Sequence, residues 1–332
     1  MSQARLQAGA HARINAPAQA GPIATRQAFG EALTELGADH PELLVLDADL
    51  SCSTKCSLFA KSYPERFFQM GIAEQNMAGV AAGLALCGKT VFCCSFACFI
   101  AGRFETIKIS VAYNRANVKI AGTHAGLGTG EDGYSQMGLE DLALMRALPG
   151  MQVYQPADGV ETRRIVAHLL ATAGPAYLRL TRQNLSAVHS AEYRFRPGRL
   201  DVLHRGAELA LLASGGVVAH ALRASELLRA DGIDASVVNV PSIKPFDDAG
   251  VRELARSHGL MVTVEDHTVI GGLGSAVSEA LTGAPGTRVH RHGILDVFGE
   301  SGPQADLYRR FGLDAEGIAE VARAQLRSQG PE

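Results

Sequence analysis

Short, continuous apolar runs alternate with longer segments of helical periodicity along residues 22–185. The apolar runs predict buried strands at Leu43–Ala48, Thr90–Phe96, Val118–Gly122, Met151–Gln155 and Ala176–Leu180. The periodic segments predict helices, the first capped by Gly88, at Ile72–Cys87, Gly102–Tyr113, Leu139–Leu148 and Gly159–Thr172. Strands connected by helices of this length indicate βαβ units, and therefore a parallel sheet that is covered on both faces.

A polar stretch at residues 186–199, which contains a proline and a glycine, interrupts this rhythm and predicts a linker. Beyond it, strands are expected at Glu208–Ala213, Ala235–Val240, Leu260–Glu265 and Thr287–Arg291, and helices at Gly216–Arg229, Gly274–Leu281 and Ala315–Leu326. We therefore expect two consecutive doubly wound α/β domains, at residues 22–185 and 200–330. Residues 1–21 lack a sustained apolar stripe and are expected to form a frayed tail.

The composition describes a globular protein. The 332 residues are 47% hydrophobic and 20% charged, with a net charge of −3, which is too apolar for a disordered chain and too neutral for binding nucleic acid by charge. The longest apolar run, Val91–Ala101, is shorter than the roughly 20 residues of a bilayer crossing, and no secretory signal precedes it. We expect a cytoplasmic protein without membrane or nucleic-acid partners.

The six cysteines all lie between Cys52 and Cys98, and none belongs to a CxxC pair. This distribution predicts reduced thiols and no metal site in this chain.

Glu74 is the acidic residue in the stretch Met70–Met77, where it begins an apolar helix rich in small residues. One interpretation is a first-turn carboxylate that complements the helix dipole. The other is a carboxylate enclosed by apolar neighbours, which holds a proton near neutral pH and shares it with a ligand nitrogen. The motif by itself leaves both interpretations open.

A glycine-rich segment, Thr123–Gly133, directly follows a predicted strand. Ligands of open parallel sheets bind at the carboxyl ends of strands, so the glycines could let backbone approach a ligand beside His124, Glu131 and Asp132. The pattern is neither a dinucleotide fingerprint nor a P-loop. A flexible surface loop is the equal alternative.

Arg182 follows the predicted strand Ala176–Leu180 in the segment Thr181–Asn184. At a strand's carboxyl end, a guanidinium can bind a phosphate or carboxylate through two parallel hydrogen bonds. A salt bridge at the domain boundary is an equal alternative.

In this order and spacing, these segments resemble the transketolase family, and more narrowly its carboxyl-terminal half encoded as a separate subunit. The resemblance covers residues 22–330 and also includes the segments CSFACF, VTVEDHTVIGGLGSAV and GILDVFGESG. It implies a pyrimidine-binding domain and a transketolase C-terminal domain, the cofactor thiamine diphosphate with Mg²⁺, and transfer of a two-carbon ketol unit from a ketose or its phosphate to an aldose.

The family holds the cofactor's diphosphate and Mg²⁺ with a Gly-Asp-Gly motif that does not occur in this sequence. The resemblance therefore implies a separate N-terminal subunit that carries this motif, with the active site between the chains in an α₂β₂ assembly.

The resemblance also assigns roles to individual residues. Glu74 would hydrogen-bond the pyrimidine nitrogen N1′ and share a proton there, against an aromatic wall formed by Phe96 and Phe99. His124 and Asp132 would hydrogen-bond sugar hydroxyls near the reacting carbons. Arg182 would bind the distal phosphate, with Ser53 as a weaker candidate.

Gln136 departs from the family pattern, which has a histidine after a Gly-Pro-Thr-like string. Glutamine donates and accepts hydrogen bonds but is neither a proton shuttle nor a cation near neutral pH. We therefore expect a specialised preference for the sugar that contacts this position.

Two alternatives remain open at this point. One is a related thiamine-diphosphate subunit that acts on pyruvate, either of the 1-deoxyxylulose-5-phosphate synthase type or the β subunit of a 2-oxo acid dehydrogenase. The other is a subunit that regulates or stabilises such an enzyme without catalytic residues. The joint presence of Glu74, Phe96, His124, Asp132 and Arg182 argues against the second, since scaffolding requires none of them.

Overall fold

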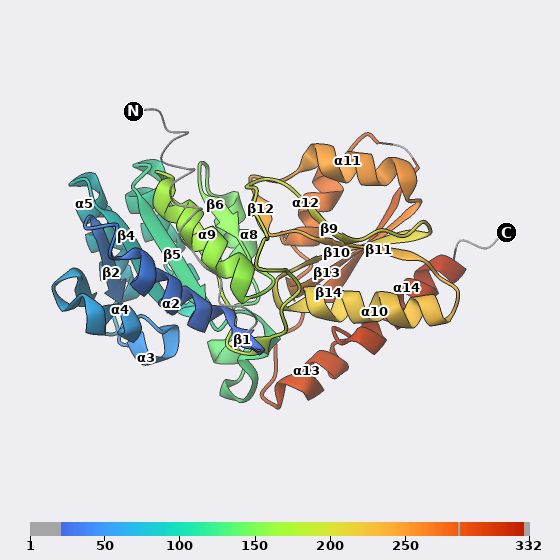
Figure 1. Ribbon diagram of the computed structural model, residues 1–332, viewed down its shortest axis with the longest axis horizontal. Coiled ribbons are helices and arrows are strands. Elements are labelled where there is room, and N and C mark those ends of the chain that lie inside the picture. Colours follow the sequence, from blue (N-terminus) through green and yellow to red (C-terminus); the bar gives the residue numbers. More distant parts are fainter. Residues whose placement is uncertain (1–20, 285, 329–332) are drawn as a thin grey trace.

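The computed structural model describes residues 21–284 and 286–328, so the predicted tail at 1–21 lies almost wholly outside the described part of the chain. Figure 1 shows two sheets, each lined by helices, with the N-terminal half coloured blue to green and the C-terminal half yellow to red. The predicted class, two doubly wound α/β domains, is confirmed.

The first sheet has seven strands in the order β12-β6-β7-β5-β4-β2-β3. All neighbours run parallel except β12, which is antiparallel to β6. The strands are β2 (Leu43–Asp47), β3 (Phe67–Gln69), β4 (Thr90–Phe96), β5 (Val118–Thr123), β6 (Gln152–Tyr154), β7 (Ala176–Arg179) and β12 (Ser242–Lys244). A separate antiparallel pair joins β1 (Ile23–Ala24) to β8 (Asn184–Leu185).

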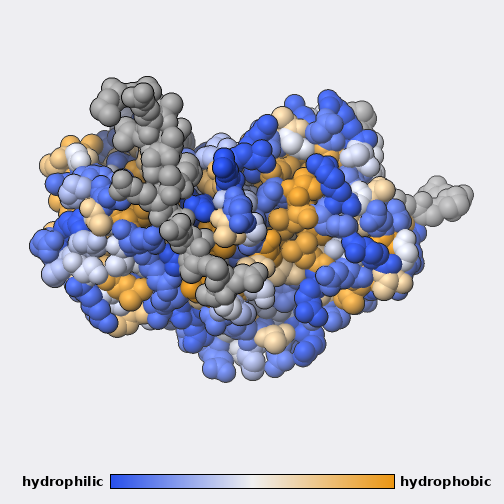
Figure 2. All heavy atoms as spheres, viewed as in Figure 1, coloured by the Kyte–Doolittle hydropathy of each residue, from blue (hydrophilic) through white to orange (hydrophobic). Residues whose placement is uncertain are grey.

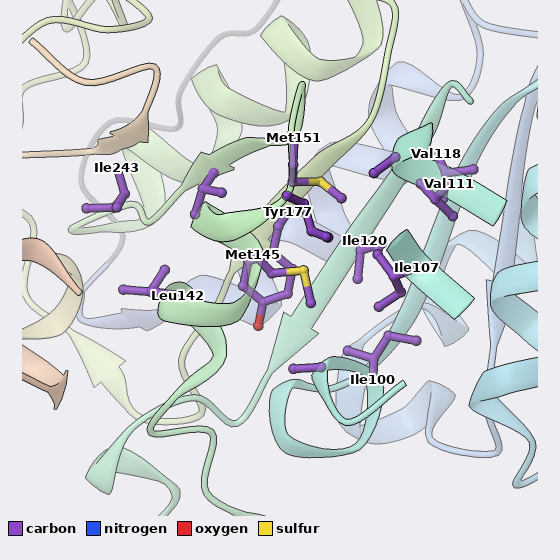
Figure 3. Close-up of a cluster of buried hydrophobic side chains, with 14 of the residues drawn as sticks. Ile100, Ile107, Val111, Val118, Ile120, Leu142, Met145, Met151, Tyr177 and Ile243 are labelled. Atoms are coloured by element: carbon purple, nitrogen blue, oxygen red, sulfur yellow. The ribbon is translucent and has the colours of Figure 1, made fainter. Parts of the chain in front are cut away.

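Side chains of this sheet alternate between two apolar layers, as the period of a strand requires. On β2, Leu44 and Leu46 face one layer, while Leu43 and Val45 face the other. The first layer is covered by α5 (Glu74–Leu86), the π-helix η2 (Ile107–Tyr113) and α8 (Asp141–Ala147), and the second by α2 (Thr25–Leu36) and α9 (Gly159–Ala171). Figure 3 shows the first layer around Ile107, Ile120 and Met145.

The second sheet has five strands in the order β14-β13-β10-β11-β9, with only β9 antiparallel to its neighbour. Its strands are β9 (Asp201–His204), β10 (Leu209–Ser214), β11 (Ala235–Asn239), β13 (Leu260–Thr268) and β14 (Arg288–Ile294). Its helices are α10 (Val218–Ala230), α11 (Asp248–Ser257), α12 (Leu273–Ala280), α13 (Gln304–Arg310) and α14 (Ala315–Arg327).

Most predicted elements occur within a few residues of their expected bounds, and β4 coincides with its prediction. The helix predicted at Gly102–Tyr113 is instead a short helix, α7 (Phe104–Thr106), that continues as η2. Elements without a prediction are mostly short: β1, α2, α3 (Ser51–Thr54), α4 (Ser57–Ser62), η1 (Pro64–Arg66), β3, α6 (Ala97–Ala101), η3 (Leu127–Asp132), η4 (Tyr134–Gln136), β8, β9, η5 (Gly215–Val217), β12, α11 and α13.

The two halves of the chain share one apolar core. β12 follows the predicted linker in sequence, yet it completes the first sheet, where Ile243 lies in the same layer as Leu142 of α8 (Figure 3). The layer continues through Leu212 of β10 and Val277 of α12 into the second domain. In the part of the chain that the structure describes, every helix is too short or too polar to cross a bilayer.

Candidate active site

Glu74 is the first residue of α5 and lies beside the end of β4. The residue is 5% exposed, and its Oε1 accepts a hydrogen bond from Ser95 Oγ at 3.1 Å. The flanking residues Ala73 and Gln75 line an open hollow of about 660 Å³. The carboxylate is therefore enclosed, as the second interpretation of the motif requires, and it lies next to a space that is open to solvent.

Three aromatic rings stack beside this carboxylate at the end of β4. The Phe96 ring stacks on the His124 imidazole with centroids 3.6 Å apart, and on the Phe99 ring at 5.5 Å. Phe96 is buried, whereas Phe99 is half-buried and presents more of its ring to solvent. Phe96 and Phe99, which the resemblance assigns to an aromatic wall, thus lie in one stack that also includes His124.

His124 is held as a neutral imidazole. Its Nδ1 lies 2.9 Å from Thr123 Oγ1, and its Nε2 lies 3.1 Å from an Arg26 guanidinium nitrogen, which can only donate. Nε2 is therefore the acceptor, and the proton is on Nδ1. Burial, and then the cations Arg26, Arg182 and Lys55, lower the pKa of His124 to about 3.

Arg26, on the first turn of α2, is a site residue that the sequence analysis missed. Its guanidinium donates to the Ser53 carbonyl oxygen at 2.8 Å as well as facing His124. Its Nε is buried and has no acceptor among the described residues. The helical spacing of Phe29, Leu33 and Leu36 was the signal that could have revealed α2, and with it an arginine next to a sheet edge.

Arg182 lies close to Arg26 with one carboxylate between the two charges. Arg182 donates to the Thr129 carbonyl oxygen at 2.6 Å, and its other terminal nitrogen lies 3.8 Å from Asp132 Oδ1. Burial and the Arg182 charge lower the pKa of Arg26, while Asp132 opposes this shift. With Lys55 nearby, cations outnumber carboxylates, which favours binding of an anion.

Contacts between distant segments bring the two arginines together. β1 pairs with β8, and Thr25 Oγ1 accepts the Thr181 amide at 2.7 Å, so the start of α2 is fixed to the segment after β7. Gly30 lets α2 approach α3, because a Cβ at this position would lie 2.5 Å from the Lys55 carbonyl oxygen. Arg26, Arg182 and Ser53 therefore converge although they are far apart in sequence.

The glycine-rich segment is not a flexible surface loop. Leu127–Gly130 is buried in η3, and a Cβ at Gly128 would lie 2.0 Å from Gln183 Oε1. A Cβ at Gly126, whose φ is +82°, would lie 2.1 Å from Asp266 Oδ2. The close approach that these two glycines permit is thus to protein side chains, which corrects the expectation that the approach is to a ligand.

The remaining predicted residues lie at the margins of this cluster. Ser53 contributes its carbonyl oxygen to Arg26, and its side chain is half-buried. Gln136 lies in η4, where its amide nitrogen is 3.5 Å from Ser135 Oγ. Among the hydrogen bonds of the described residues, none joins Gln136 to His124 or Arg182, so the structure does not bring it into the cluster directly.

A series of hydrogen-bonded residues connects the Glu74 carboxylate to Arg26. Ser95 donates to Glu74 with its hydroxyl, and its carbonyl oxygen lies 3.4 Å from Thr123 Oγ1. Thr123 contacts His124, which contacts Arg26. The enclosed carboxylate and the cluster of cationic side chains therefore lie at the same carboxyl edge of the sheet.

The fold defines a two-domain α/β protein whose candidate site residues lie where parallel strands end, the edge at which ligands of such sheets bind. Family models for the transketolase pyrimidine binding domain and the transketolase C-terminal domain match residues 21–187 and 198–318. The chain belongs to the transketolase family.

Several relatives have the length of this chain. It is 44% identical to a protein of Methanocaldococcus jannaschii described as a transketolase C-terminal section, over 92% of this chain and 96% of that protein. It is 39% identical to the 6-deoxy-6-sulfo-D-fructose transketolase subunit of Clostridium sp., over 90% and 92%. A solved split-gene transketolase, an inactive β4 tetramer, matches at 48% identity and a TM-score of 0.84, over 92% and 98%. Human transketolase is 37% identical over 92% of this chain but only 49% of its own length.

Proposed function

We propose that the chain is the C-terminal subunit of a two-component, thiamine-diphosphate-dependent transketolase. It would transfer a two-carbon ketol unit from an anionic ketose to an aldose, together with a separate N-terminal subunit. The observation that carries the proposal is the series of hydrogen-bonded residues from the enclosed Glu74 carboxylate to the Arg26 guanidinium, whose pKa the nearby Arg182 charge lowers. Such an enzyme needs an acidic side chain for the cofactor ring at one end of its active site, and cationic side chains for the substrate anion at the other end.

The residues at one end fit the pyrimidine ring of the cofactor. Glu74 would hydrogen-bond the ring nitrogen N1′ and hold the shared proton at its carboxyl group. The hydrogen bond from the Ser95 hydroxyl to Oε1 would keep this carboxyl group in place. Phe96 and Phe99 would pack against the ring and exclude water from the Glu74 contact. When bound, thiamine diphosphate supplies carbanion chemistry at its thiazolium C2.

The residues at the other end fit a ketose with a terminal anion. Arg26 and Arg182, with Ser53 at the margin, would bind the phosphate or sulfonate, and His124 and Asp132 would hydrogen-bond hydroxyl groups. Because His124 is neutral, its role is to orient the sugar rather than to carry a positive charge. The anion anchors the remote end of the substrate, so that its carbonyl is oriented at the reacting end.

The specialised preference predicted from Gln136 remains part of this proposal. A similar subunit acts on a sulfonated ketose and another on apulose 4-phosphate, so related chains serve different anionic sugars. Comparing kcat/KM for xylulose 5-phosphate with kcat/KM for modified or unphosphorylated ketoses measures the preference. A preference for xylulose 5-phosphate over the modified and unphosphorylated ketoses would contradict the proposed specialised preference.

The partner subunit would bind the diphosphate and Mg²⁺ with the Gly-Asp-Gly motif that this chain lacks. The surface along α5 is suited to such a partner, because apolar side chains are exposed just before α5 (Ile72, 84%), at its last residue (Leu86, 64%) and at the end of the neighbouring η2 (Tyr113, 82%). The similar split-gene transketolase is described as an inactive β4 tetramer. These observations support an α₂β₂ assembly with the active site between chains.

The test is reconstitution with the N-terminal subunit, thiamine diphosphate and Mg²⁺, followed by Glu74→Gln. The variant should lose ketol transfer by roughly 100-fold or more, because glutamine cannot hold the shared proton. Glu65→Gln, at an exposed position, is the matched control and should retain full activity. Full activity of Glu74→Gln would support a purely regulatory subunit, and CO₂ release from pyruvate would support the pyruvate-acting alternative.

A further inference from the structure

The segment Gly126–Gly133, which we name the substrate loop, is clamped by the second domain. Besides the approach of Asp266 to Gly126, a Cβ at Gly130 would lie 3.1 Å from Gln304 Cγ of α13, and one at Gly133 would lie 3.4 Å from Ser301 Cβ. Parts of the loop therefore pack against the second domain. This packing contributes to the burial of Gly126–Gly130 and Gly133, whereas Glu131 and Asp132 are exposed.

Hydrogen bonds from the second domain reach the loop backbone at three points. Asp266 Oδ1, at the end of β13, accepts the Leu127 amide at 2.8 Å. The Gln304 side-chain amide donates to the Gly128 carbonyl oxygen, and Ser301 Oγ donates to the Glu131 carbonyl oxygen at 2.7 Å. Both ends and the middle of the loop thus depend on side chains outside the first domain.

Asp266 is itself held by a buried tyrosine. Tyr308 donates its hydroxyl hydrogen to Asp266 Oδ2 at 2.7 Å and accepts a hydrogen bond from Gln183 Nε2 at 2.7 Å. Asp266 and Tyr308 are 3% and 5% exposed. Since Gln183 is next to Arg182 in the chain, the same tyrosine connects Asp266 to the segment that carries the second arginine.

The loop connects three residues of the candidate site. His124 lies two residues before it, Asp132 lies within it, and the Thr129 carbonyl oxygen within it accepts the hydrogen bond from Arg182. Thr129 Oγ1 also donates to the His124 carbonyl oxygen at 2.7 Å. A displacement of the loop would therefore move the groups proposed to bind the sugar while Glu74, on α5, stays in place.

We propose that Asp266, Tyr308 and Gln304 are positioning residues: the C-terminal domain holds the substrate loop in the geometry that binds the anionic ketose. The loop-holding step is a property of this chain alone. Its consequence for the sugar rests on the proposed function.

Hydrogen–deuterium exchange of the full chain tests the first step without any ligand or partner. Tyr308→Phe removes the hydroxyl between Asp266 and Gln183, and Gln304→Ala removes the bond to Gly128 from a half-buried position. In both variants, backbone amides of residues 124–133 should exchange roughly tenfold faster, the order expected from loss of one buried hydrogen bond. Arg309→Ala, on the same helix with its side chain 70% exposed, is the control and should not change exchange in the loop. Unchanged exchange in both test variants would overturn the inference.

The second step is measured in the reconstituted enzyme as a division between KM and kcat. Both variants should raise KM for the phosphorylated ketose roughly five- to tenfold, with the affinity for thiamine diphosphate unchanged, because Glu74 does not contact the loop. A loss of kcat and cofactor affinity with unchanged KM would contradict positioning. The unmodified reconstituted chain could transfer no ketol unit while the amides of the loop exchange as expected in both variants. The proposed function would then be wrong, and the inference that the second domain holds the loop would be retained.

Discussion

The guanidiniums of Arg26 and Arg182 lie near each other with only Asp132 to offset their repulsion. Bringing like charges together is unfavourable, and a buried guanidinium nitrogen without an acceptor adds to that cost. A bound phosphate or sulfonate supplies both the missing negative charge and the missing acceptors. The unfavourable charge of the pair and the unpartnered Arg26 Nε are consistent with the anion site that we propose, beside the ion pair of Arg182 with Asp132.

The proposed anion site predicts a selective loss on removal of one arginine. Arg182→Ala should raise KM for a phosphorylated ketose by roughly tenfold to a hundredfold, the value of a charged hydrogen bond, and should leave KM for an unphosphorylated ketose nearly unchanged. Steady-state kinetics with both donors measures this. Arg256→Ala, with its side chain 77% exposed, is the control. Equal losses for both donors would show that Arg182 does not bind the anion.

The neutral state of His124 predicts a pH dependence. With a folded pKa of about 3 against about 6.5 in the unfolded chain, only the unfolded chain binds this proton between these values. The contribution of His124 therefore lowers the free energy of unfolding as the pH falls from 6.5 towards 3, and has no effect above 6.5.

Nuclear magnetic resonance of the His124 ring nitrogens checks this directly. They should show no titration between pH 5 and 8, and Arg26→Ala should raise the pKa because it removes a neighbouring positive charge. A His124 that titrates near 6.5 in the unmodified chain would contradict the assignment of a neutral ring.

At the scale of elements, the site depends on how closely α2 approaches α3. Gly30→Ala would place a Cβ 2.5 Å from the Lys55 carbonyl oxygen. We expect it to lower the free energy of unfolding by about 1–3 kcal/mol, as overpacking does, and to raise KM for the anionic donor because Arg26 shifts.

Gly79→Ala on α5 is the matched control, since a Cβ there meets no atom within 4 Å. It should stabilise the isolated chain by about 0.5–1 kcal/mol through helix propensity. Urea unfolding of both variants measures the difference, and equal stability of the two would contradict the close contact at Gly30.

The elements that could be predicted from the sequence are those whose own apolar and polar residues reflect which of their faces are buried. β4 and β5 are apolar on both faces because helices cover both faces of the sheet, so their continuous apolar runs were readable. β12 was not readable, since it is short and is defined by its pairing with β6 rather than by its own sequence. The π-helical hydrogen bonding of η2 likewise has no period that distinguishes it from an α-helix.

The residues of the candidate site differ in the same way in whether the sequence could predict them. His124, Asp132 and Arg182 follow strands, and a strand's end was visible in the pattern. Arg26 was not, because its importance comes from contacts such as Thr25–Thr181, whose partners are 156 positions apart. The contribution of the second domain was also missed, because the Asp266 side chain accepts the Leu127 amide across the domain boundary, a contact between residues 139 positions apart.

At the scale of the whole molecule, the surface carries exposed apolar side chains on both domains. On the face shown in Figure 2, hydrophobic residues form separate patches among hydrophilic ones, over both halves of the molecule. The exposed apolar face of α5, which borders the hollow beside Glu74, contains Val80. A face of this kind close to an incomplete site is suited to association with another chain.

Val80→Glu should therefore weaken assembly with the N-terminal subunit by roughly tenfold or more, because a buried unpaired charge is costly. Leu227→Glu is a closely matched control, since both residues are 36% exposed and Leu227 lies on α10 of the second domain. Analytical ultracentrifugation of the reconstituted mixture measures both. Equal assembly of the two variants would place the partner elsewhere.

The strand β12 has a consequence for how such proteins can diverge. It lies some distance beyond residues 186–199, yet it forms the border of the sheet that precedes them. A recombination event at that junction would join the first part of this chain to the C-terminal part of a distant relative. The first sheet would then have the edge strand of that relative in place of its own β12. Selection should therefore favour recombination outside this gene over recombination within it, so that the two parts are inherited together.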